Sequence, residues 1–416
     1  MRKIFSSVDI GSSTIKVIVC ELLDKKLNVL ASIIMPSNGI KKGNVEDYDM
    51  AKESIKRAIN EVNTSLGINI DKVIINVPMN DTEYMINEGT VTITNKEKQV
   101  SGNDMVNALQ TSIYNKIPKS RELVTIWPIK YKVDTINDEI LSPRGLNADK
   151  LSVTSMSMTV PKKNIYKIIT IFQDLQIEVI DILFGIIGDY YEFKNNDTNH
   201  GICGVINIGS EKTELAVFKN GIIYNSMLMD IGSISIDNDI SYVYDMSHNQ
   251  AKKLKEVFAL AHQDFASSSD IYEFTNKSGI RTKLNQLEVS KVVSIKIKEI
   301  LENAKKVLND LTKKEISYII ISGGIVNMPG FDIIAREVFN EKTIVGPIKT
   351  IGVRDNSYSQ SLGMIKYFIE KLSIRGKEYT MFDEDKALGL VENRKNLSSN
   401  NSVFGKLFTY LFDKED

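Results

Sequence analysis

Cysteine is scarce in this sequence, with two residues among 416. Each lies in an apolar stretch, Cys20 in IKVIVC and Cys203 in GICGVI. Such surroundings are typical of buried, reduced thiols and not of a disulfide framework. The cysteine content therefore indicates a protein of the cytosol.

An excess of charge is also missing. The chain has 52 Lys and Arg against 53 Asp and Glu, a net charge of -1. Because no overall positive field attracts nucleic acid, we exclude nucleic acid as a partner. The three histidines, His200, His248 and His262, share no metal-ligand spacing with each other or with cysteine, so we expect them at the surface or at caps. The sequence shows no motif that would pair a nucleophilic side chain with a general base, so we assign no catalytic residue.

Long apolar runs are absent as well. The longest, from Val179 to Gly188, spans ten residues and contains Asp181, which is about half of what a bilayer span needs. Near the start of the chain, Asp9 interrupts the sequence before any apolar stretch long enough for a signal peptide. We therefore expect a protein that is neither exported nor transmembrane. With 42% hydrophobic residues the chain can still bury a large core, and its length suggests two to four structural units.

One pattern occurs twice, half a chain apart. VDIGSSTIK begins at Val8 and INIGSEKTELAVF begins at Ile206. In both, an apolar strand ends in a polar residue that is followed by glycine and hydroxyl side chains. Hairpin turns of this composition expose backbone N–H groups that bind anionic oxygen. Two such turns facing each other would clamp a polyphosphate, so the repeat predicts two related halves around a phosphate site.

Further residues extend this site. Asp9 ends the strand before the first turn, where a carboxylate can order Mg²⁺ through water. Lys16 could reach the same phosphates as a point charge. A third glycine turn, ISGGIV from Ile321 to Val326, follows an apolar strand and begins a helix, where glycine lets a ring or a phosphate approach closely.

Periodicity gives a coarse secondary structure. A strand hairpin with a DKK turn opens the chain, and a second hairpin with a KNG turn follows Gly201. Between the two halves, residues 84–162 combine strand and helix patterns and predict a compact α+β insert. Residues 376–401 are polar and pattern-free, which predicts a linker. The expected helices are 48–66, 103–116 within the insert, about 163–178, 249–262, 284–311 and one that follows the third glycine turn.

The last stretch, SVFGKLFTYLFDKED, is amphipathic. Its apolar residues follow the spacing i, i+1, i+4, i+5, i+8, i+9, one stripe of a helix. They are Val403, Phe404, Leu407, Phe408, Leu411 and Phe412. Such a helix is too short to span a bilayer and would lie in the membrane interface; the alternative is a helix packed on the protein's own core. Because acidic residues outnumber lysines here, membrane binding should depend more on apolar insertion than on salt.

Taken together, these features resemble the actin-like ATPase superfamily and, within it, the FtsA family of bacterial cell-division proteins. The matching motifs are VDIGSSTIK for the first phosphate motif, INIGSEKTELAVF for the second, ISGGIVNMPGFDIIAREVF for the adenosine motif, MDIGSISIDNDIS for a glycine segment, AKKLKEVFALA for an Ala-Glu-x-x-Lys helix and SVFGKLF for the terminal membrane helix. The insert resembles the small domain that FtsA proteins carry in place of the actin subdomain covering the nucleotide cleft.

The resemblance implies an α/β, actin-like (ribonuclease H-like) fold of two duplicated domains around a nucleotide cleft. The implied parts are domain 1A at 1–83, 163–200 and 347–375, an SHS2-like insert domain 1C at 84–162, domain 2A at 201–226 and 315–346, a helical subdomain 2B at 227–314, a flexible linker at 376–401 and a membrane-targeting amphipathic helix at 402–416.

The resemblance also implies a function. Such a protein binds ATP and Mg²⁺, forms filaments with itself, and anchors the ring of the tubulin-like protein FtsZ to the cytoplasmic face of the cell membrane at the division site, as a peripheral protein. The insert would contact other division proteins. The nucleotide would be bound by Gly11, Ser12, Ser13, Thr14, Lys16, Gly209, Ser210, Lys212, Thr213, Gly232, Lys255, Gly323, Gly324 and Ile325, and the metal by Asp9 and Asn207.

Residues on and near the long helix are candidates for the FtsZ contact. Arg281, Lys296 and Glu299 stand near the positions where FtsA relatives grip the acidic C-terminal tail of FtsZ. The alternative interpretation is a solvated helix face, because Lys296 stands where relatives often have Arg, and lysine cannot form the two-pronged bond to a carboxylate.

The sequence departs from the family pattern within the second phosphate motif. Asn207 replaces the usual Asp, and Glu211 adds negative charge near the phosphates. Lys252 stands where the family commonly has Glu, although Lys255 matches. Losing a carboxylate beside Mg²⁺ removes a charge that orders the metal and the attacking water, so we expect ATP binding with weak or absent hydrolysis.

Two alternative functions stay open at this point. A pilus-assembly ATP-binding protein of the PilM type would not require the tethered apolar tail. A small-molecule kinase of the sugar kinase and actin fold would need a catalytic Asp over a substrate pocket, and the sequence offers none that we can name.

Overall fold

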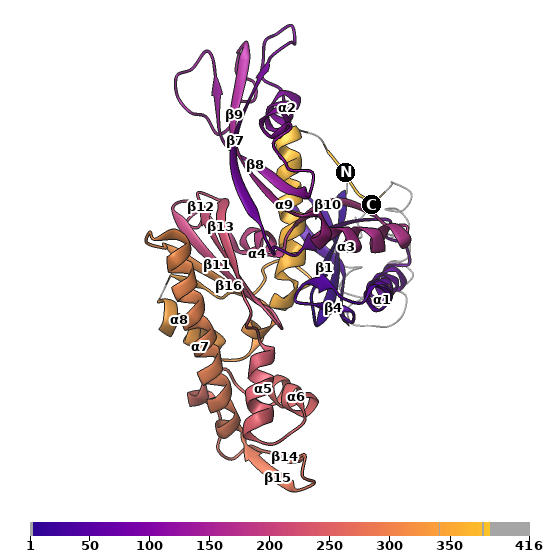
Figure 1. The fold of residues 1–416 in the computed structure, drawn as a ribbon, viewed down its shortest axis with the longest axis vertical. Coiled ribbons are helices and arrows are strands. Elements are labelled where there is room, and N and C mark those ends of the chain that lie inside the picture. Colours follow the sequence, from indigo (N-terminus) through magenta and orange to yellow (C-terminus); the bar gives the residue numbers. More distant parts are fainter. Residues whose placement is uncertain (1–2, 341, 377, 383–416) are drawn as a thin grey trace, which may run out of the picture.

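The computed structural model describes residues 3–340, 342–376 and 378–382. Two five-stranded sheets lie beside each other in the middle of an elongated molecule (Figure 1). A three-stranded sheet with helix α2 lies at one end of the long axis, and helices α5 and α6 with the strands β14 and β15 lie at the other. The predicted α/β fold of two lobes with an insert is confirmed.

The first lobe is built on a sheet of strand order β10-β6-β1-β2-β3. Its strands are β1 (Lys3–Ile10), β2 (Thr14–Leu23), β3 (Lys26–Pro36), β6 (Lys72–Val77) and β10 (Glu178–Phe184). Strands β1, β2 and β3 form an antiparallel meander, and β6 and β10 continue the sheet in parallel. Because the sheet is covered on both faces, β1 is buried from Ile4 to Ile10.

Helices α1 (Tyr48–Leu66) and α3 (Lys162–Asp174) belong to this lobe, and the small strands β4 (Ile40–Lys41) and β5 (Asn44–Val45) precede α1. Helix α1 occupies the predicted range. Asp47 caps its start by accepting a hydrogen bond from the Met50 backbone N–H, and Gly67 ends it in the left-handed conformation at φ 70°.

The second lobe repeats the first. Its sheet has the order β13-β12-β11-β16-β17, again a three-stranded antiparallel meander extended by two parallel strands. The strands are β11 (Ile202–Ile208), β12 (Thr213–Lys219), β13 (Ile222–Met229), β16 (Tyr318–Ser322) and β17 (Thr343–Ile344). Helices α7 (Gln286–Thr312) and α8 (Phe331–Phe339) pack on this lobe. The duplication predicted from the sequence is confirmed.

Two helices connect the lobes. The chain passes from the first lobe to the second through α4 (Gly185–Phe193) and returns through α9 (Ser359–Arg375). Their backbones touch where Gly188 meets Gly363, since a Cβ added to Gly363 would lie 1.7 Å from the Gly188 carbonyl oxygen. Only glycine permits this crossing.

The insert contains β7 (Glu83–Thr92), α2 (Gly102–Ile113), β8 (Arg121–Val133) and β9 (Lys150–Pro161), with strand order β7-β9-β8. It has its own apolar cluster, which includes Ile93, Leu109 and Leu151. The predicted α+β character of this segment is confirmed. Arg144 joins the insert to the end of α9 by donating to the Ser373 carbonyl oxygen at 2.9 Å.

The region of α5 (Ile234–Val243) and α6 (His248–Val257) differs from prediction at two points. The helix expected to reach His262 ends at Val257, because the following backbone bonds elsewhere: the Ala261 N–H donates to the Pro329 carbonyl oxygen. The strands β14 (Ile271–Thr275) and β15 (Arg281–Asn285) were not predicted, and β15 takes up Leu284, so that α7 begins at Gln286. Three short 3-10 helices complete the described elements: Gln263–Phe265, Gly324–Asn327 and Asn356–Tyr358.

The predicted linker, 376–401, is wrong for residues 378–382. Met381 and Phe382 are buried, and the Met381 N–H donates to the Ile4 carbonyl oxygen at 3.0 Å. The apolar pair therefore fastens residues 378–382 to β1. The rest of the linker and the amphipathic stretch, residues 383–416, lie outside the described residues.

Two expectations from composition are tested within the described part of the chain. Cys20 and Cys203 are both buried and free, as predicted. No helix among the described residues is long and apolar enough to cross a membrane.

Candidate functional site

A cleft of about 720 Å³ separates the two lobes. It is lined by the turn between β1 and β2, the turn between β11 and β12, the glycine turn after β16, and helix α6. These are the three glycine turns predicted from the sequence together with the helix that carries the AKKLKEVFALA motif. Segments from both halves of the chain therefore meet at one site.

The first two turns have the same construction. The Gly11 N–H donates to the Thr14 carbonyl oxygen at 3.0 Å, and the Gly209 N–H donates to the Lys212 carbonyl oxygen at 3.0 Å. A Cβ at either glycine would lie 2.9 Å from that same oxygen, so both turns exclude larger residues. The turns repeat because the two hairpins that carry them repeat.

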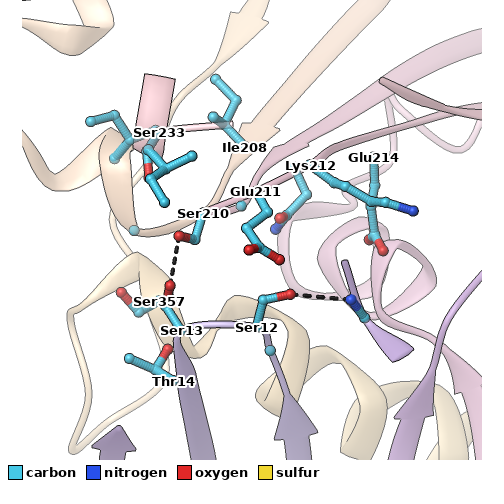
Figure 2. Close-up of a pocket in the computed structure, with 18 of the residues that line it drawn as sticks. Ser12, Ser13, Thr14, Ile208, Ser210, Glu211, Lys212, Glu214, Ser233 and Ser357 are labelled. Carbon is cyan, nitrogen blue, oxygen red and sulfur yellow. Dashed lines mark hydrogen bonds between the residues drawn. The ribbon is translucent and has the colours of Figure 1, made fainter. Parts of the chain in front are cut away.

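The two turns face each other across the cleft. The Ser13 hydroxyl donates to the Ser210 hydroxyl oxygen at 2.6 Å, a hydrogen bond between the lobes (Figure 2). The prediction that Gly11 and Gly209 share one cleft is confirmed. Backbone N–H groups and hydroxyls from both lobes thus converge on a space that suits an anion.

The first turn is bordered by a buried ion pair. Asp9 is 3% exposed, and its carboxylate accepts hydrogen bonds from Lys16 Nζ at 2.9 Å and Asn76 Nδ2 at 2.7 Å. Lys16 also lines the cleft, so its charge is available to a ligand there.

The second turn is bordered by carboxylates that the sequence analysis missed. Asn207 Nδ2 donates to Asp189 Oδ2 at 2.9 Å, and Gln360 Nε2 donates to Asp189 at 3.0 Å and to Glu214 at 3.3 Å. Burial raises the pKa of Asp189 to about 6. Burial and the nearby carboxylates of Asp189 and Asp9 raise the pKa of Glu214 to about 8, which leaves Glu214 mostly protonated at neutral pH. The sequence contained one indication of Asp189: it is a single acidic residue that directly follows the apolar stretch LFGIIG.

Glu211 contacts the opposite lobe. Its carboxylate accepts a hydrogen bond from the Lys42 N–H at 2.6 Å, and Lys42 Nζ pairs with Asp230 at 3.1 Å. The neighbouring Gly43 N–H donates to the Ser12 hydroxyl at 3.1 Å (Figure 2). Lys42 and Gly43 form the turn between β4 and β5, so this small hairpin of the first lobe is tied to the second.

The third turn and α6 form the remaining wall. Gly323 has φ 104°, and a Cβ there would lie 2.4 Å from the Ile208 carbonyl oxygen, so glycine is required where this turn packs behind β11. Lys255 is 6% exposed and pairs with Asp237 at 2.7 Å. Lys252, the departure from the family pattern, also lines the cleft.

Most of the predicted ligand residues line this cleft. They are Asp9, Gly11, Ser12, Ser13, Thr14, Lys16, Asn207, Gly209, Ser210, Lys212, Lys255, Gly323, Gly324 and Ile325. Thr213 and Gly232 do not line it and lie behind the second turn. The Thr213 hydroxyl donates to the Ile231 carbonyl oxygen at 2.7 Å, and a Cβ at Gly232 would lie 2.3 Å from the Ser210 carbonyl oxygen. Both residues support the turn from behind.

The side chains of the cleft show whether the expected Mg²⁺ could be bound there. Within the described residues, no group of three or more His, Cys, Asp or Glu side chains is arranged to hold a metal ion. The Asp9 carboxylate and the Asn207 amide nevertheless border the two phosphate turns. Mg²⁺ that arrives with a nucleotide keeps water and phosphate ligands and needs only one or two protein oxygens, so these residues fit it.

The three residues expected to contact a partner are not on one element. Arg281 lies in β15, not on the long helix, and pairs with Glu273. Lys296 lies in α7 and pairs with Asp239 at 3.0 Å and with Glu299 at 2.8 Å. Both cations are thus already held by acidic neighbours, and Arg281 lies near the long helix but on a strand of its own.

Two family models match the chain. The model described as cell division protein FtsA matches residues 204–363, and the model of the SHS2 domain inserted in FtsA matches residues 80–159. Together the matched ranges span more than half of the chain.

Curated relatives match over most of their length. Cell division protein FtsA of Bacillus subtilis (strain 168) is 27% identical over 380 residues, which are 91% of this chain and 86% of the relative. Cell division protein FtsA of Streptococcus pneumoniae is 24% identical over 364 residues, 87% of this chain and 79% of the relative.

Solved structures show the same fold at low identity. A PilM-PilN type IV pilus biogenesis complex has a TM-score of 0.55 at 12% identity and covers 86% of this chain and 97% of that chain. MreB5 of Spiroplasma citri bound to ADP has a TM-score of 0.52 at 12% identity and covers 90% of this chain and 98% of that chain. These similarities establish the actin-like fold.

Proposed function

The chain belongs to the FtsA family of actin-like cell-division proteins, and from this premise we propose that it binds ATP with Mg²⁺ between its lobes. We further propose that it self-associates and anchors the FtsZ ring to the cytoplasmic face of the cell membrane, with the insert contacting other division proteins.

One observation carries the nucleotide proposal. Two glycine turns of the same construction, around Gly11 and Gly209, face each other across a single cleft and are bridged by Ser13 and Ser210. Their N–H groups and hydroxyls are suited to the oxygens of a polyphosphate. The MreB5 structure, which shares the fold, is bound to ADP.

The charges of the cleft support binding more than hydrolysis. Mg²⁺ would be held through water by Asp9 and Asn207 and would offset the phosphate charge. Lys16 would add a point charge from the first lobe. Asn207 is an amide and cannot take a proton, and Glu214, with its pKa raised to about 8, is mostly protonated at pH 7. We therefore propose weak or absent ATP turnover. Brisk Mg²⁺-dependent phosphate release by the purified chain would refute this part.

Calorimetric titration of the full chain with ATP and Mg²⁺ tests the site itself. We expect one ATP per chain, and an affinity at least about tenfold lower in the double variant Gly11→Ala/Gly209→Ala. Gly346→Ala is the matched control, because a Cβ at Gly346 meets its nearest neighbour at 4.0 Å. Equal affinity in the double variant and the wild type would contradict the assigned site.

The membrane proposal concerns the amphipathic stretch outside the described residues. Co-sedimentation with vesicles of anionic phospholipid should compare the full chain with one that ends at Asn400. We expect truncation to abolish binding, since six large apolar side chains are removed. Unchanged binding would favour the PilM-like alternative, which does not require the tail.

The FtsZ contact is supported by Arg281, a cation of strand β15, which lies at the far end of the molecule from the insert (Figure 1). Arg281 has a side chain that is 78% exposed, and an acidic peptide could replace Glu273 as its partner. Pull-down with an FtsZ-tail peptide should weaken in Arg281→Glu and strengthen in Glu299→Lys. Lys253→Glu, on the exposed side of α6, is the control for net charge. A peptide that binds all these variants equally would exclude this surface.

A further inference from the structure

Asn207 is held in one orientation at the end of β11. Its Nδ2 donates to Asp189 Oδ2 at 2.9 Å and to Ser322 Oγ at 3.1 Å. The Ser322 hydroxyl donates onward to the Ile206 carbonyl oxygen at 3.3 Å, so its oxygen is free to accept from Asn207. The opposite orientation would place the Asn207 amide oxygen against a carboxylate oxygen. Both amide hydrogens of Asn207 therefore point away from the cleft.

The amide oxygen of Asn207 is left for the cleft. Asn207 lines the cleft, and its Oδ1 accepts no hydrogen bond from the described residues. Asp9 has the corresponding place in the first lobe, since each of the two residues precedes an Ile-Gly pair at the end of the first strand of its sheet. An oxygen is thus presented at both strand ends.

Asp189 is built into the crossing of the two connecting helices. The close contact of Gly188 with Gly363 brings α4 against α9, and Asp189 follows Gly188 directly. The Asp189 side chain is fully buried and accepts hydrogen bonds from Ser359 Oγ at 2.5 Å and Gln360 Nε2 at 3.0 Å. Ser359 and Gln360 are the first two residues of α9, whose N-terminal end favours a negative charge.

We infer that Asp189 is a positioning residue for the metal side of the nucleotide site. It holds the Asn207 amide with its oxygen toward the cleft, and it places behind Asn207 the negative charge that an aspartate at position 207 would supply directly. The oxygen it orients serves a hydrated Mg²⁺ that accompanies the nucleotide. This inference rests on the proposed binding of ATP with Mg²⁺ and assigns a role to a residue that does not itself touch the ligand.

The orientation of Asn207 can be tested without any ligand. Nuclear magnetic resonance of the full chain labelled with ¹⁵N-asparagine gives the side-chain NH₂ signals, and Asn207→Asp identifies the pair that belongs to Asn207. We expect slow exchange with solvent in the wild type and fast exchange in Asp189→Ala, which removes the acceptor. Exchange that is unchanged in Asp189→Ala would overturn the positioning role.

The inference that Asp189 supports Mg²⁺ binding is tested by the Mg²⁺ concentration that gives half-maximal ATP binding. We call this part of the inference the metal half. We expect Asp189→Asn to raise this concentration about 10- to 100-fold, while ATP affinity measured in EDTA stays unchanged. The exchanged pair Asn207→Asp/Asp189→Asn should recover most of the loss, because it returns one carboxylate and one amide to the same contact. Asp181→Asn is the control, since Asp181 pairs with Lys371 away from the cleft.

The outcomes separate this inference from the proposed function. ATP binding with the same Mg²⁺ requirement in Asp189→Asn, or an exchanged pair as impaired as Asp189→Asn, would overturn the inference alone. A wild-type chain that binds no ATP at any Mg²⁺ concentration would overturn the proposed function and the metal half of the inference together.

Discussion

The two lobes have the same strand order and the same glycine turn, but different charges surround that turn. In the first lobe the next-to-last residue of β1 is Asp9, which is paired with Lys16 of the same hairpin. In the second lobe the next-to-last residue of β11 is Asn207, and the carboxylate beside it comes from Asp189 on a connecting helix. The repeated topology therefore gives both turns the same arrangement of backbone N–H groups. The negative charge beside each turn, in contrast, depends on which element packs against that turn.

This comparison of the two lobes depends first on the contact between helices α4 and α9, which cross where they connect the lobes. Gly363→Val should destabilise the protein by at least about 3 kcal/mol, because its Cβ would overlap the Gly188 carbonyl oxygen and force the helices apart. Thermal unfolding measures the loss. Gly346→Val, at an open position, serves as the control. A melting temperature of Gly363→Val equal to that of the control would show that the helices do not cross as described.

The charge difference between the turns should appear when a lysine of each turn, Lys16 of the first and Lys212 of the second, is replaced in turn. Lys16→Met leaves the buried Asp9 carboxylate without its cation and should cost about 2–3 kcal/mol of stability. Lys212→Met loses a 3.3 Å hydrogen bond to Asn80 and breaks no buried ion pair among the described residues, so it should cost less than about 1 kcal/mol. Chemical denaturation of both variants gives the two values. Equal costs would mean that the lobes do not differ in charge as we describe.

The acidic side of the second lobe predicts a dependence on pH. The pKa of Glu214 is raised from 4.5 to about 8 in the folded protein, so its protonated form stabilises the fold below pH 4.5, and this contribution is lost as the pH rises through 8. Glu214→Gln should therefore melt like the wild type at pH 4.5 and a few degrees higher at pH 9. Equal melting temperatures at pH 9 would show that Glu214 ionises without penalty.

The smallest effect concerns the hydrogen bond between the turns. Ser13→Ala removes the bond to Ser210 and should weaken closure of the lobes by about 0.5–1.5 kcal/mol, with a several-fold loss of ATP affinity. Ser210→Ala should behave in the same way, and the double variant should lose little more than either one. Losses that simply add in the double variant would indicate that the two hydroxyls act separately.

The repeat, the helix at 48–66 and the two hairpins could be predicted because each depends on local signals: strand alternation, an N-cap and turn residues. The end of α6 could not, since its following backbone bonds to Pro329, far along the chain. Met381 and Phe382 were predicted to belong to a polar linker. Their burial could not be predicted locally, because the strand they pack against, β1, is remote in sequence.

Within the site, the spacing of the glycines predicted the turns that line the cleft. It did not predict which side chains bond to the polar residues that precede these turns. Asp189 joins Asn207 only through the glycine contact between α4 and α9, which no local pattern reveals. Thr213 and Gly232 fit the family motifs but lie behind the turn, because position within a motif does not determine which way a residue faces.

The central claim is that both turns hold one nucleotide. Hydrogen–deuterium exchange of the full chain, titrated with ATP at fixed Mg²⁺, measures it most directly through the peptides that contain residues 11–14 and 209–213. We predict that both peptides gain protection with one shared dissociation constant. Protection of one turn alone, or two different dissociation constants, would contradict the account.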